Sequence, residues 1–368
     1  MIVGLVKEIK VHEYRVGLTP DCVAAYVKEG HTVLVETGAG HGTGFEDAAY
    51  RDQGAQIIDS KQRLFDEAEM IIKVKEPLPG EYDFFHKDQI LYTYLHLAAD
   101  ELQAKALIEK GVKAVAYETI TDDTGHLPCL IPMSEIAGRL ATQEGAKYLE
   151  KPFGGRGVLL GGVPGVQRGN VTIIGGGIVG LNACKIAVGM GANVTILDIS
   201  AQRLAYLDDI FGSRITTLYS TRTNILSSIK EADLLIGAVL IPGAAAPKLI
   251  SQEDLKLMKK GSVIVDVAID QGGCFETSHA TYHDNPTYVV EDIVHYCVAN
   301  MPGAVSLTST MALTSNTLRI GLEIANKGLE TAAKENINIM NGLNIYDGKC
   351  TNEAVAKSLG LKYWEPKF

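Results

Sequence analysis

The chain has 368 residues, of which 46% are hydrophobic and 21% are charged, the balance of an ordinary folded protein and not of a disordered or fibrous one. At roughly 100 to 200 residues per domain, this length predicts about two domains. With 34 basic and 44 acidic residues, the formal net charge is −10. An acidic chain without a basic block repels phosphate backbones and anionic lipids, which argues against nucleic-acid and membrane-surface binding and favours a small-molecule partner.

Neither a membrane-spanning segment nor a signal peptide is predicted. The longest run without Asp, Glu, Lys or Arg, residues 293–318, is too rich in Ser, Thr and Asn for a spanning helix. The start of the chain places Lys7, Glu8 and Lys10 where a signal peptide needs its apolar core. We therefore expect a cytoplasmic protein. Its six cysteines show neither CxxC pairs nor zinc-like spacing, which predicts reduced, mostly buried thiols and no metal site.

Short apolar runs alternate with segments of helical periodicity, the pattern of β-α units on a mainly parallel sheet. Strands are predicted at residues 2–6, 32–36, 70–74, 90–95 and 112–117, with helices near residues 20–29, 46–53 and 100–110. Asp100 is the predicted N-cap and Gly111 the predicted C-cap of the last of these helices. This order predicts a doubly wound first domain.

The pattern changes near residue 130, where one long helix is predicted to begin at Ser134. A loop with seven glycines between Lys151 and Gly169 follows it, and a second series of strands is predicted at residues 171–174, 193–197, 215–219, 234–239 and 263–267. After Pro302 the chain returns to helices, near residues 307–326 and 352–359. Because no strand is predicted in this closing part, we expect it to pack on the first domain.

The strongest local signal is a glycine motif between an apolar strand and a helix. Gly175, Gly177 and Gly180 have the GxGxxG spacing, in which the glycines permit a tight turn, backbone approach to a pyrophosphate and close packing of helix on strand. The next predicted strand is followed by Asp198, whose carboxylate would accept hydrogen bonds from ribose hydroxyls and repel a 2′-phosphate. The alternative, a capping turn with an unrelated aspartate, does not explain why all the parts occur in order. The motif predicts NAD binding.

Other residues near this motif are predicted to border the dinucleotide. Arg203 is close enough to Asp198 in sequence to flank the adenosine, although it could equally be a solvated charge on a helix. Residues 238–244 and 266–270 follow predicted strands. Since ligands bind outside the carboxyl ends of strands in open α/β sheets, these two segments should border the nicotinamide half.

Longer runs extend beyond the glycine motif and carry a family resemblance. They are KEIKVHEYRVGLTP, KVKEP, YLHLAAD, PMSEIAGRLATQEGAKYLEKPFGGRGVLLGGVPGV, ADLLIGAVLIPGAAAPKL, DVAIDQGGCFETS and HYCVANMPGAVSLTST. Together with the glycine motif, they resemble the alanine dehydrogenases over nearly the whole chain. The resemblance implies NAD-dependent, reversible oxidative deamination of L-alanine to pyruvate and ammonia.

The resemblance also implies an architecture. Two doubly wound, Rossmann-like domains are expected: a discontinuous catalytic domain of residues 1–130 and 303–368, and an inserted NAD-binding domain of residues 131–302. A homohexamer is expected as well. The rival interpretation is the NAD-binding component of the proton-translocating transhydrogenase, which shares this plan, and a weaker alternative is a protein that only binds NAD.

Two cations are implied to bind the substrate carboxylate. Arg15 matches the family position, and its planar guanidinium suits a bidentate salt bridge. Lys75 is the second cation. Lys73 competes with it, since residues two places apart on a strand point the same way and alternation cannot separate them. Only the family position favours Lys75.

Two further residues are implied to move protons. His96 ends the predicted strand QILYTYLH, and an imidazole that titrates near neutral pH suits proton transfer at the carbonyl or carbinolamine oxygen. Asp270 ends VIVDVAID and would activate water or assist the departing ammonia, unless it is only a turn cap. Some relatives have arginine at the position of His279, so a cofactor contact there stays open. The full set implied to bind NAD is Ser134, Gly175, Gly177, Ile178, Val179, Gly180, Asp198, Arg203, Ser220, Val239, Leu240, Val267, Ala268, Ile269, Asp270, Val298, Ala299, Asn300 and Met301.

Overall fold

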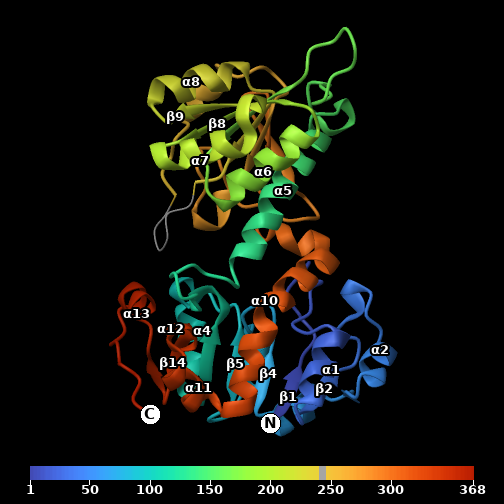
Figure 1. Ribbon diagram of the computed structural model, residues 1–368, viewed down its shortest axis with the longest axis vertical. Coiled ribbons are helices and arrows are strands. Elements are labelled where there is room, and N and C mark those ends of the chain that lie inside the picture. Colours follow the sequence, from blue (N-terminus) through green and yellow to red (C-terminus); the bar gives the residue numbers. More distant parts are fainter. Residues whose placement is uncertain (240–245) are drawn as a thin grey trace. The chain divides into compact units, whose positions relative to one another are not determined.

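The computed structural model describes residues 1–239 and 246–368, which form two compact units (Figure 1). Unit 1 comprises Met1–Met133 with Gly303–Phe368, and unit 2 comprises Ser134–Pro302. Each unit contains one mainly parallel sheet with helices, so the α/β class predicted from the sequence is confirmed. Leu240, implied to contact the cofactor, lies outside the described residues.

Unit 1 alternates strands and helices and takes up both ends of the chain. Its first part contains β1 (Ile2–Leu5), α1 (Pro20–Lys28), β2 (Thr32–Glu36), α2 (Asp47–Asp52), β3 (Gln56–Ile58), α3 (Lys61–Glu67), β4 (Met70–Ile72), β5 (Ile90–Thr93), α4 (Glu101–Lys110) and β6 (Lys113–Ala116). Its closing part contains α10 (Ser306–Lys327), α11 (Leu329–Glu335), α12 (Ile337–Gly342), β14 (Leu343–Tyr346), β15 (Lys349–Cys350) and α13 (Glu353–Leu359).

Unit 2 repeats the alternation. The helix α5 (Ile131–Tyr148) crosses the boundary between the units along the chain, and it is followed by β7 (Asn170–Ile174), α6 (Ile178–Gly189), β8 (Asn193–Asp198), α7 (Ala201–Phe211), β9 (Ile215–Tyr219), α8 (Arg222–Glu231), β10 (Leu234–Gly237), α9 (Gln252–Leu255), β11 (Val263–Asp266), β12 (Thr287–Val290) and β13 (Ile293–Tyr296).

The two sheets share one topology. The sheet of unit 1 has the order β15-β14-β6-β5-β4-β1-β2-β3, in which β14 runs antiparallel to both of its neighbours and the strands from β6 to β3 are parallel. That of unit 2 has the order β12-β13-β11-β10-β7-β8-β9, parallel except for β12. Read from its parallel core, each has the 3-2-1-4-5-6 order of a doubly wound fold, which binds ligands where the strand order reverses. The reversal lies between β1 and β4 in unit 1, and between β7 and β10 in unit 2.

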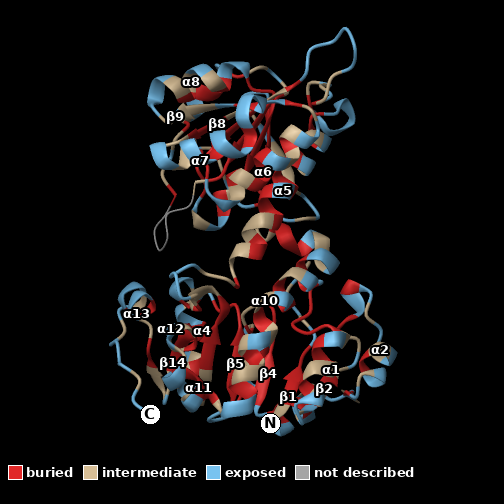
Figure 2. Ribbon diagram, viewed as in Figure 1, coloured by how far each residue is buried: buried red, intermediate tan, exposed pale blue. Residues whose placement is uncertain are grey.

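Five strands of the two sheets are buried along their whole length. Every residue of β4, β5, β10, β11 and β13 is buried, and Figure 2 shows the buried residues concentrated on the strands of each unit. Because helices cover both faces of such a sheet, its strands read as continuous apolar runs instead of alternating ones. This is why most of the parallel strands could be predicted from the sequence, although β3 and β13 were not.

Helix ends follow their capping residues. The Asp100 side chain accepts a hydrogen bond from the Gln103 amide at 2.9 Å, and Gly111 closes α4 with φ of +68°, so both predicted caps are confirmed. The predicted start of α5 at Ser134 is wrong by three residues, because the helix begins at Ile131. Pro132 does not prevent the earlier start, since a proline in the first turn lacks only an N–H that has no partner in the helix.

The closing part of the chain differs from the expectation in one respect. It does belong to unit 1, but it contributes two strands, where none was predicted. The strands β14 and β15 form an antiparallel hairpin that extends the sheet beyond β6. Asp347 and Gly348 form its turn with φ of +50° and +65°, and Asp-Gly is a preferred pair for a two-residue hairpin turn.

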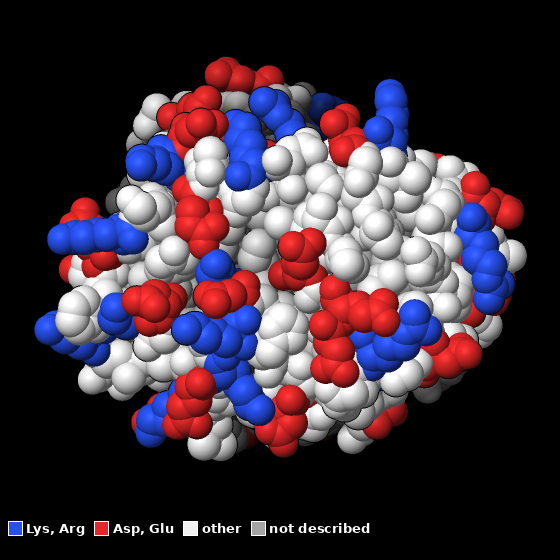
Figure 3. Space-filling view, turned by 90° about the horizontal axis from the view of Figure 1, so that it is seen from below, with Lys and Arg blue, Asp and Glu red and all other residues white. Residues whose placement is uncertain are grey.

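The surface charges, the helices and the cysteines can be compared with the predictions from composition. On the face drawn in Figure 3, basic and acidic side chains lie beside one another instead of gathering by sign. Among the described residues, no helix has the length and apolar character that crossing a membrane requires. All six cysteines are buried and unpaired, as predicted. No group of three His, Cys, Asp or Glu suited to a metal ion occurs in the described ranges.

Candidate functional site

In unit 2, the glycine loop lies between β7 and α6, next to the reversal in strand order. A Cβ atom at Gly180 would lie 1.8 Å from the Gly175 carbonyl oxygen, and one at Gly175, where φ is +103°, would lie 2.6 Å from the Ala238 carbonyl oxygen. A Cβ at Gly177 would meet nothing within 4 Å. Two of the glycines therefore allow close packing, and the third leaves open space at the N-terminus of α6, where backbone N–H groups favour a phosphate.

Asp198 and Arg203 are both tied to this loop. The Asp198 carboxylate accepts hydrogen bonds from the amides of Gly176 at 2.7 Å and Ser200 at 2.8 Å. Arg203 donates to the carbonyl oxygens of Gly176 and Gly177. Arg203 thus lies against the glycine loop, whereas whether it also contacts a cofactor stays a prediction. Each Asp198 oxygen keeps a further lone pair, so the carboxylate retains capacity to accept ribose hydroxyls.

The remaining residues of the implied cofactor set occupy several places in unit 2. Val239 follows β10 beside Gly175. Ser220 follows β9 and donates its amide to the Asp198 carbonyl oxygen at 2.9 Å. Ser134 is half-buried within the first turns of α5. The run Val298–Met301 follows β13, and its Asn300 has φ of +61°.

The strand before Asp270, β11, stops at Asp266, one residue earlier than predicted. Residues Val267–Gln271 form a short 3-10 helix, labelled η7, on which Asp270 is exposed. The buried Asp266 carboxylate caps η7 through the Ala268 amide at 3.1 Å and also accepts from the Cys274 amide at 2.8 Å and the Ser278 hydroxyl at 2.6 Å. Burial raises the pKa of Asp266, against the opposing effect of these hydrogen bonds. Asp266 thus fixes the segment that presents Asp270.

We assign no cofactor contact to His279. Its ring stacks on Tyr288 with centroids 3.7 Å apart, and its amide donates to the Tyr288 hydroxyl at 3.0 Å. These contacts explain its position without a cofactor.

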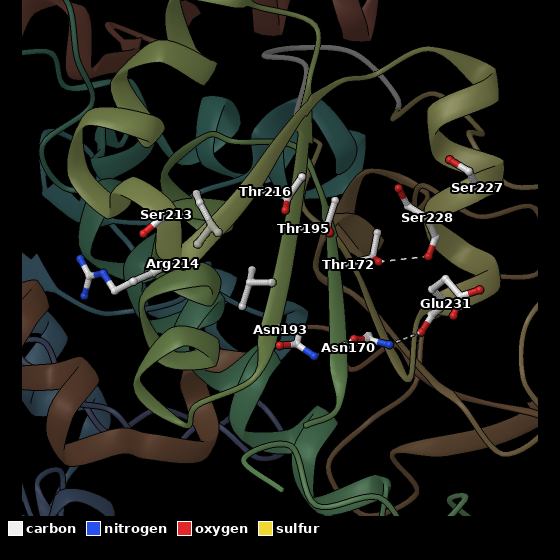
Figure 4. A pocket seen from close by; sticks show the side chains of 12 residues that line it. Asn170, Thr172, Asn193, Thr195, Ser213, Arg214, Thr216, Ser227, Ser228 and Glu231 are labelled. Atoms are coloured by element: carbon white, nitrogen blue, oxygen red, sulfur yellow. Dashed lines mark hydrogen bonds between the residues drawn. The ribbon is translucent and has the colours of Figure 1, made fainter. Parts of the chain in front are cut away.

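Unit 2 also contains a hollow of about 420 Å³ that is not the candidate site (Figure 4). Asn170 and Asn193, the first residues of β7 and β8, lie in its lining together with Glu231 at the end of α8. These residues mark the amino edge of the sheet, whereas the glycine loop follows the carboxyl end of β7. The hollow is thus separated from the groups that carry the nucleotide motif.

In unit 1, three implied site residues follow the carboxyl ends of neighbouring strands. Arg15 lies in the loop after β1, Lys75 lies after β4, and His96 lies after β5, so they surround the place where the strand order reverses. Tyr94 is close enough to Arg15 for the cation to lower the hydroxyl pKa against the larger effect of burial, which raises it. Its ring also stacks on His96, with centroids 6.1 Å apart. The fold therefore brings Arg15 and His96 to the same edge.

Arg15 is held by a buried carboxylate that the sequence did not reveal. Its Nε and Nη2 donate to the two oxygens of Glu13 at 2.7 and 2.5 Å, and its amide donates to the Glu13 Oε1 at 3.1 Å. Its Nη1 lies 3.1 Å from the Met133 sulfur. Burial opposes the charge of Arg15, but the hydrogen bonds and charge of Glu13 outweigh this and raise the pKa of the guanidinium.

The two lysines that sequence alternation could not separate are distinguished by burial. Lys73 is fully buried between two carboxylates, with its Nζ 3.1 Å from Glu8 and 3.2 Å from Glu81. Burial opposes its charge, yet the charges of Glu8 and Glu81 raise its pKa. Lys75 is half-exposed, and its amide donates to the Glu8 carboxylate at 3.2 Å. Lys73 is therefore internal, whereas Lys75 lies nearer the surface, where its charge also lowers the pKa of Glu76 against the effect of burial.

This difference predicts unequal effects on stability. Replacing Lys73 by methionine should lower the free energy of unfolding by about 3–5 kcal/mol, because two buried carboxylates lose their counter-charge. Replacing Lys75 by methionine should lower it by less than about 1 kcal/mol, as is usual for half-exposed side chains. Urea unfolding of the two variants measures both values. Equal losses would contradict the assignment of Lys73 as the internal partner.

His96 does not end a strand. The strand β5 stops at Thr93, and His96 lies three residues later in the left-handed region, with φ of +51°. Its ring is exposed, apart from the stack on Tyr94, while its amide donates to the Glu118 carboxylate at 2.6 Å. The strand ends early because the chain turns at His96 into a short 3-10 helix, labelled η3 (Leu97–Ala99).

Models of known protein families match most of the chain. Family models for the alanine dehydrogenase/PNT N-terminal and C-terminal domains match residues 4–137 and 141–353. The chain belongs to the alanine dehydrogenase/PNT family. Within it, the alanine dehydrogenase of Bacillus subtilis (strain 168) is 59% identical over 364 residues, which cover 99% of this chain and 96% of that protein.

Two solved structures extend the likeness to three dimensions. An L-alanine dehydrogenase has a TM-score of 0.95 at 51% identity and covers 98% of this chain and 99% of its own. A transhydrogenase from Sinorhizobium meliloti has a TM-score of 0.84 at 22% identity and covers 96% and 100%, a likeness that shows the fold alone. The resemblance to alanine dehydrogenases inferred from the sequence motifs is thus confirmed.

Proposed function

We propose that the chain is an NAD-dependent alanine dehydrogenase, which interconverts L-alanine, NAD and water with pyruvate, ammonia and NADH. The observation that carries the proposal is the 59% identity to an alanine dehydrogenase across almost the whole of both chains. The geometry supports it, because both reversals in strand order are lined by groups suited to this chemistry. Unit 2 has the nucleotide motif, and unit 1 has two cations and an imidazole.

Unit 2 has the features of an NAD site. The open space at Gly177 and the N-terminus of α6 suit the pyrophosphate, and Asp198 suits the adenosine ribose. The Asp198 carboxylate would repel a 2′-phosphate, which favours NAD over NADP. Bound NAD supplies the acceptor for the hydride that leaves the substrate Cα. We assign the other implied residues, from Ser134 to the Val298–Met301 run, to contacts with the same NAD.

Unit 1 has the features of a substrate site. Arg15 is pre-oriented by Glu13, and Lys75 supplies a second cation on the adjacent strand end. Together they suit the carboxylate of L-alanine or pyruvate. Holding the carboxylate at two points fixes the orientation of Cα, which lowers the entropic part of the barrier.

Proton transfer falls to His96 and Asp270. During deamination, an iminium forms at Cα and water adds to it to give a carbinolamine. Asp270 accepts a proton from that water and returns it to the carbinolamine nitrogen, and His96 accepts the proton of the carbinolamine hydroxyl as ammonia leaves. The exposed ring of His96 and the exposed carboxylate of Asp270 are both reachable from solvent, so each regains its starting protonation state in every cycle.

The deamination rate should increase from neutral to alkaline pH. The reacting amine must be neutral before hydride leaves Cα, and the fraction of neutral amine rises with pH. Steady-state kcat/KM for L-alanine, measured with NAD saturating, gives the profile. A flat profile between neutral and alkaline pH would contradict the proposed order of steps.

The purified protein alone tests the function. We expect L-alanine to produce NADH, seen by its absorbance, together with pyruvate and ammonia in equal amounts. A protein that binds NADH but does not reduce NAD with L-alanine would instead be a transhydrogenase component or a binding protein. We further propose a cytoplasmic homohexamer, a substrate role for unit 1 and an NAD role for unit 2, in keeping with the family.

A further inference from the structure

The loop that presents His96 is held by a carboxylate from the neighbouring strand. The strands β5 and β6 are parallel, with Thr93 opposite Ala116. A short 3-10 helix, η4 (Tyr117–Thr119), follows β6 directly and places Glu118 beside the turn after β5. The Glu118 carboxylate accepts hydrogen bonds from two successive amides, Leu95 at 3.1 and 3.2 Å and His96 at 2.6 Å.

This contact acts where the backbone is least relaxed. His96 has φ of +51° and ψ of +31°, a left-handed conformation that is unfavourable for a residue with a side chain. Successive N–H groups that converge on one anion form a stable concavity, and the charge of the anion strengthens each bond. Glu118 therefore stabilises the left-handed backbone conformation of His96, which would otherwise relax.

The rest of the segment transmits this constraint to the imidazole. Leu95 is fully buried in the core of unit 1 and anchors one side of the turn. Tyr94 is fixed by its hydroxyl, which donates to the Cys129 carbonyl oxygen at 2.5 Å, and its ring stacks on His96. Glu118 holds the backbone of His96, and Tyr94 stacks on its ring. The exposed imidazole therefore keeps one orientation.

We propose that Glu118 is a positioning residue for the reaction and acts only through His96. The inference rests on the proposed function of His96 in proton transfer. This role is more specific than capping. A carboxylate that only stabilised unit 1 would lower kcat by the same factor with and without His96. Loss of the carboxylate should let the turn relax and move the imidazole away from the substrate.

A double-mutant cycle tests this. The variants are Glu118→Ala, His96→Ala and the double variant, in the full-length protein with L-alanine and saturating NAD. Glu118→Ala should lower kcat about 10- to 100-fold, as expected when a catalytic group is displaced by about 1 Å, and leave NADH affinity unchanged. In the His96→Ala background the same substitution should change kcat by less than about two-fold, since residues that act as a unit are not additive.

Two further variants keep the result interpretable. Glu118→Gln retains the size and one acceptor oxygen, so it replaces Glu118→Ala in the cycle if that variant does not fold, with a smaller expected loss. Asp100→Asn is the matched control, because the Asp100 carboxylate caps the next helix, α4, through the Gln103 amide at 2.9 Å. Its kcat should equal the wild-type value. Equal losses from Glu118 substitution in both backgrounds, or no loss at all, would overturn the inference. A wild-type protein inactive with L-alanine would instead refute the proposed function.

Discussion

Replacing His96 by alanine should lower kcat for L-alanine oxidation by about 10²- to 10⁴-fold, the usual contribution of a general acid–base group. The imidazole is exposed at the carboxyl edge of unit 1 and lies on a turn that buried neighbours hold in place. Its removal takes away the acceptor for the carbinolamine proton but none of the groups of the glycine loop. NADH affinity should therefore stay unchanged.

Steady-state kinetics and NADH fluorescence titration measure the two quantities. His86→Ala is a suitable control, because His86 is also exposed but precedes β5, at the amino end of the same strand. It should retain full turnover. Wild-type turnover in His96→Ala would remove His96 from the mechanism, and a parallel loss of NADH affinity would show that the substitution disturbs more than proton transfer.

The second large effect concerns two glycines of one motif. Alanine at Gly180 places its Cβ 1.8 Å from a backbone oxygen, so the loop or the helix must move. Such overpacking should lower the free energy of unfolding by about 1–3 kcal/mol and weaken NADH binding as well. Alanine at Gly177 meets no atom within 4 Å and needs no unusual backbone angle, since φ is −64°. It should leave stability unchanged yet weaken NADH binding at least about ten-fold, because its methyl group takes the space needed by the pyrophosphate.

Urea unfolding and NADH titration of the two variants separate these outcomes. Gly189→Ala is the control: it lies at the other end of α6, where a Cβ also meets nothing within 4 Å, and it should affect neither property adversely. Full NADH affinity in Gly177→Ala would mean that no phosphate approaches this backbone. Unchanged stability in Gly180→Ala would contradict the packing described for the loop.

The sequence predicted most of the parallel strands but missed β3 and β13, and it missed both hairpins. Strands buried on both faces are continuous apolar runs, which are visible without any tertiary information. The hairpin of β14 and β15 was missed although its Asp347-Gly348 turn is a usable signal. The turn between β12 and β13 consists of Glu291 and Asp292, both at positive φ, and this pair gives no comparable signal because it contains no glycine.

The prediction of the site was limited in a similar way, because local motifs could be found in the sequence and long-range contacts could not. The spacing of Gly175, Gly177 and Gly180 predicts a nucleotide loop because the motif is local. By contrast, the difference between Lys73 and Lys75 depends on Glu8, which is more than 60 residues away along the chain. Glu118 and His96 are 22 residues apart and meet only because β5 and β6 are neighbours. Contacts of this kind follow from the sheet order and not from any pattern in the sequence.

Oxidation of L-alanine that carries deuterium at Cα tests the central claim most directly, which is that this chain moves hydride from the Cα of L-alanine to NAD. Mass spectrometry of the NADH product follows the label. We predict that the deuterium appears in NADH and that the initial rate is no faster than with unlabelled L-alanine. NADH without deuterium, or no NADH at all, would contradict the account.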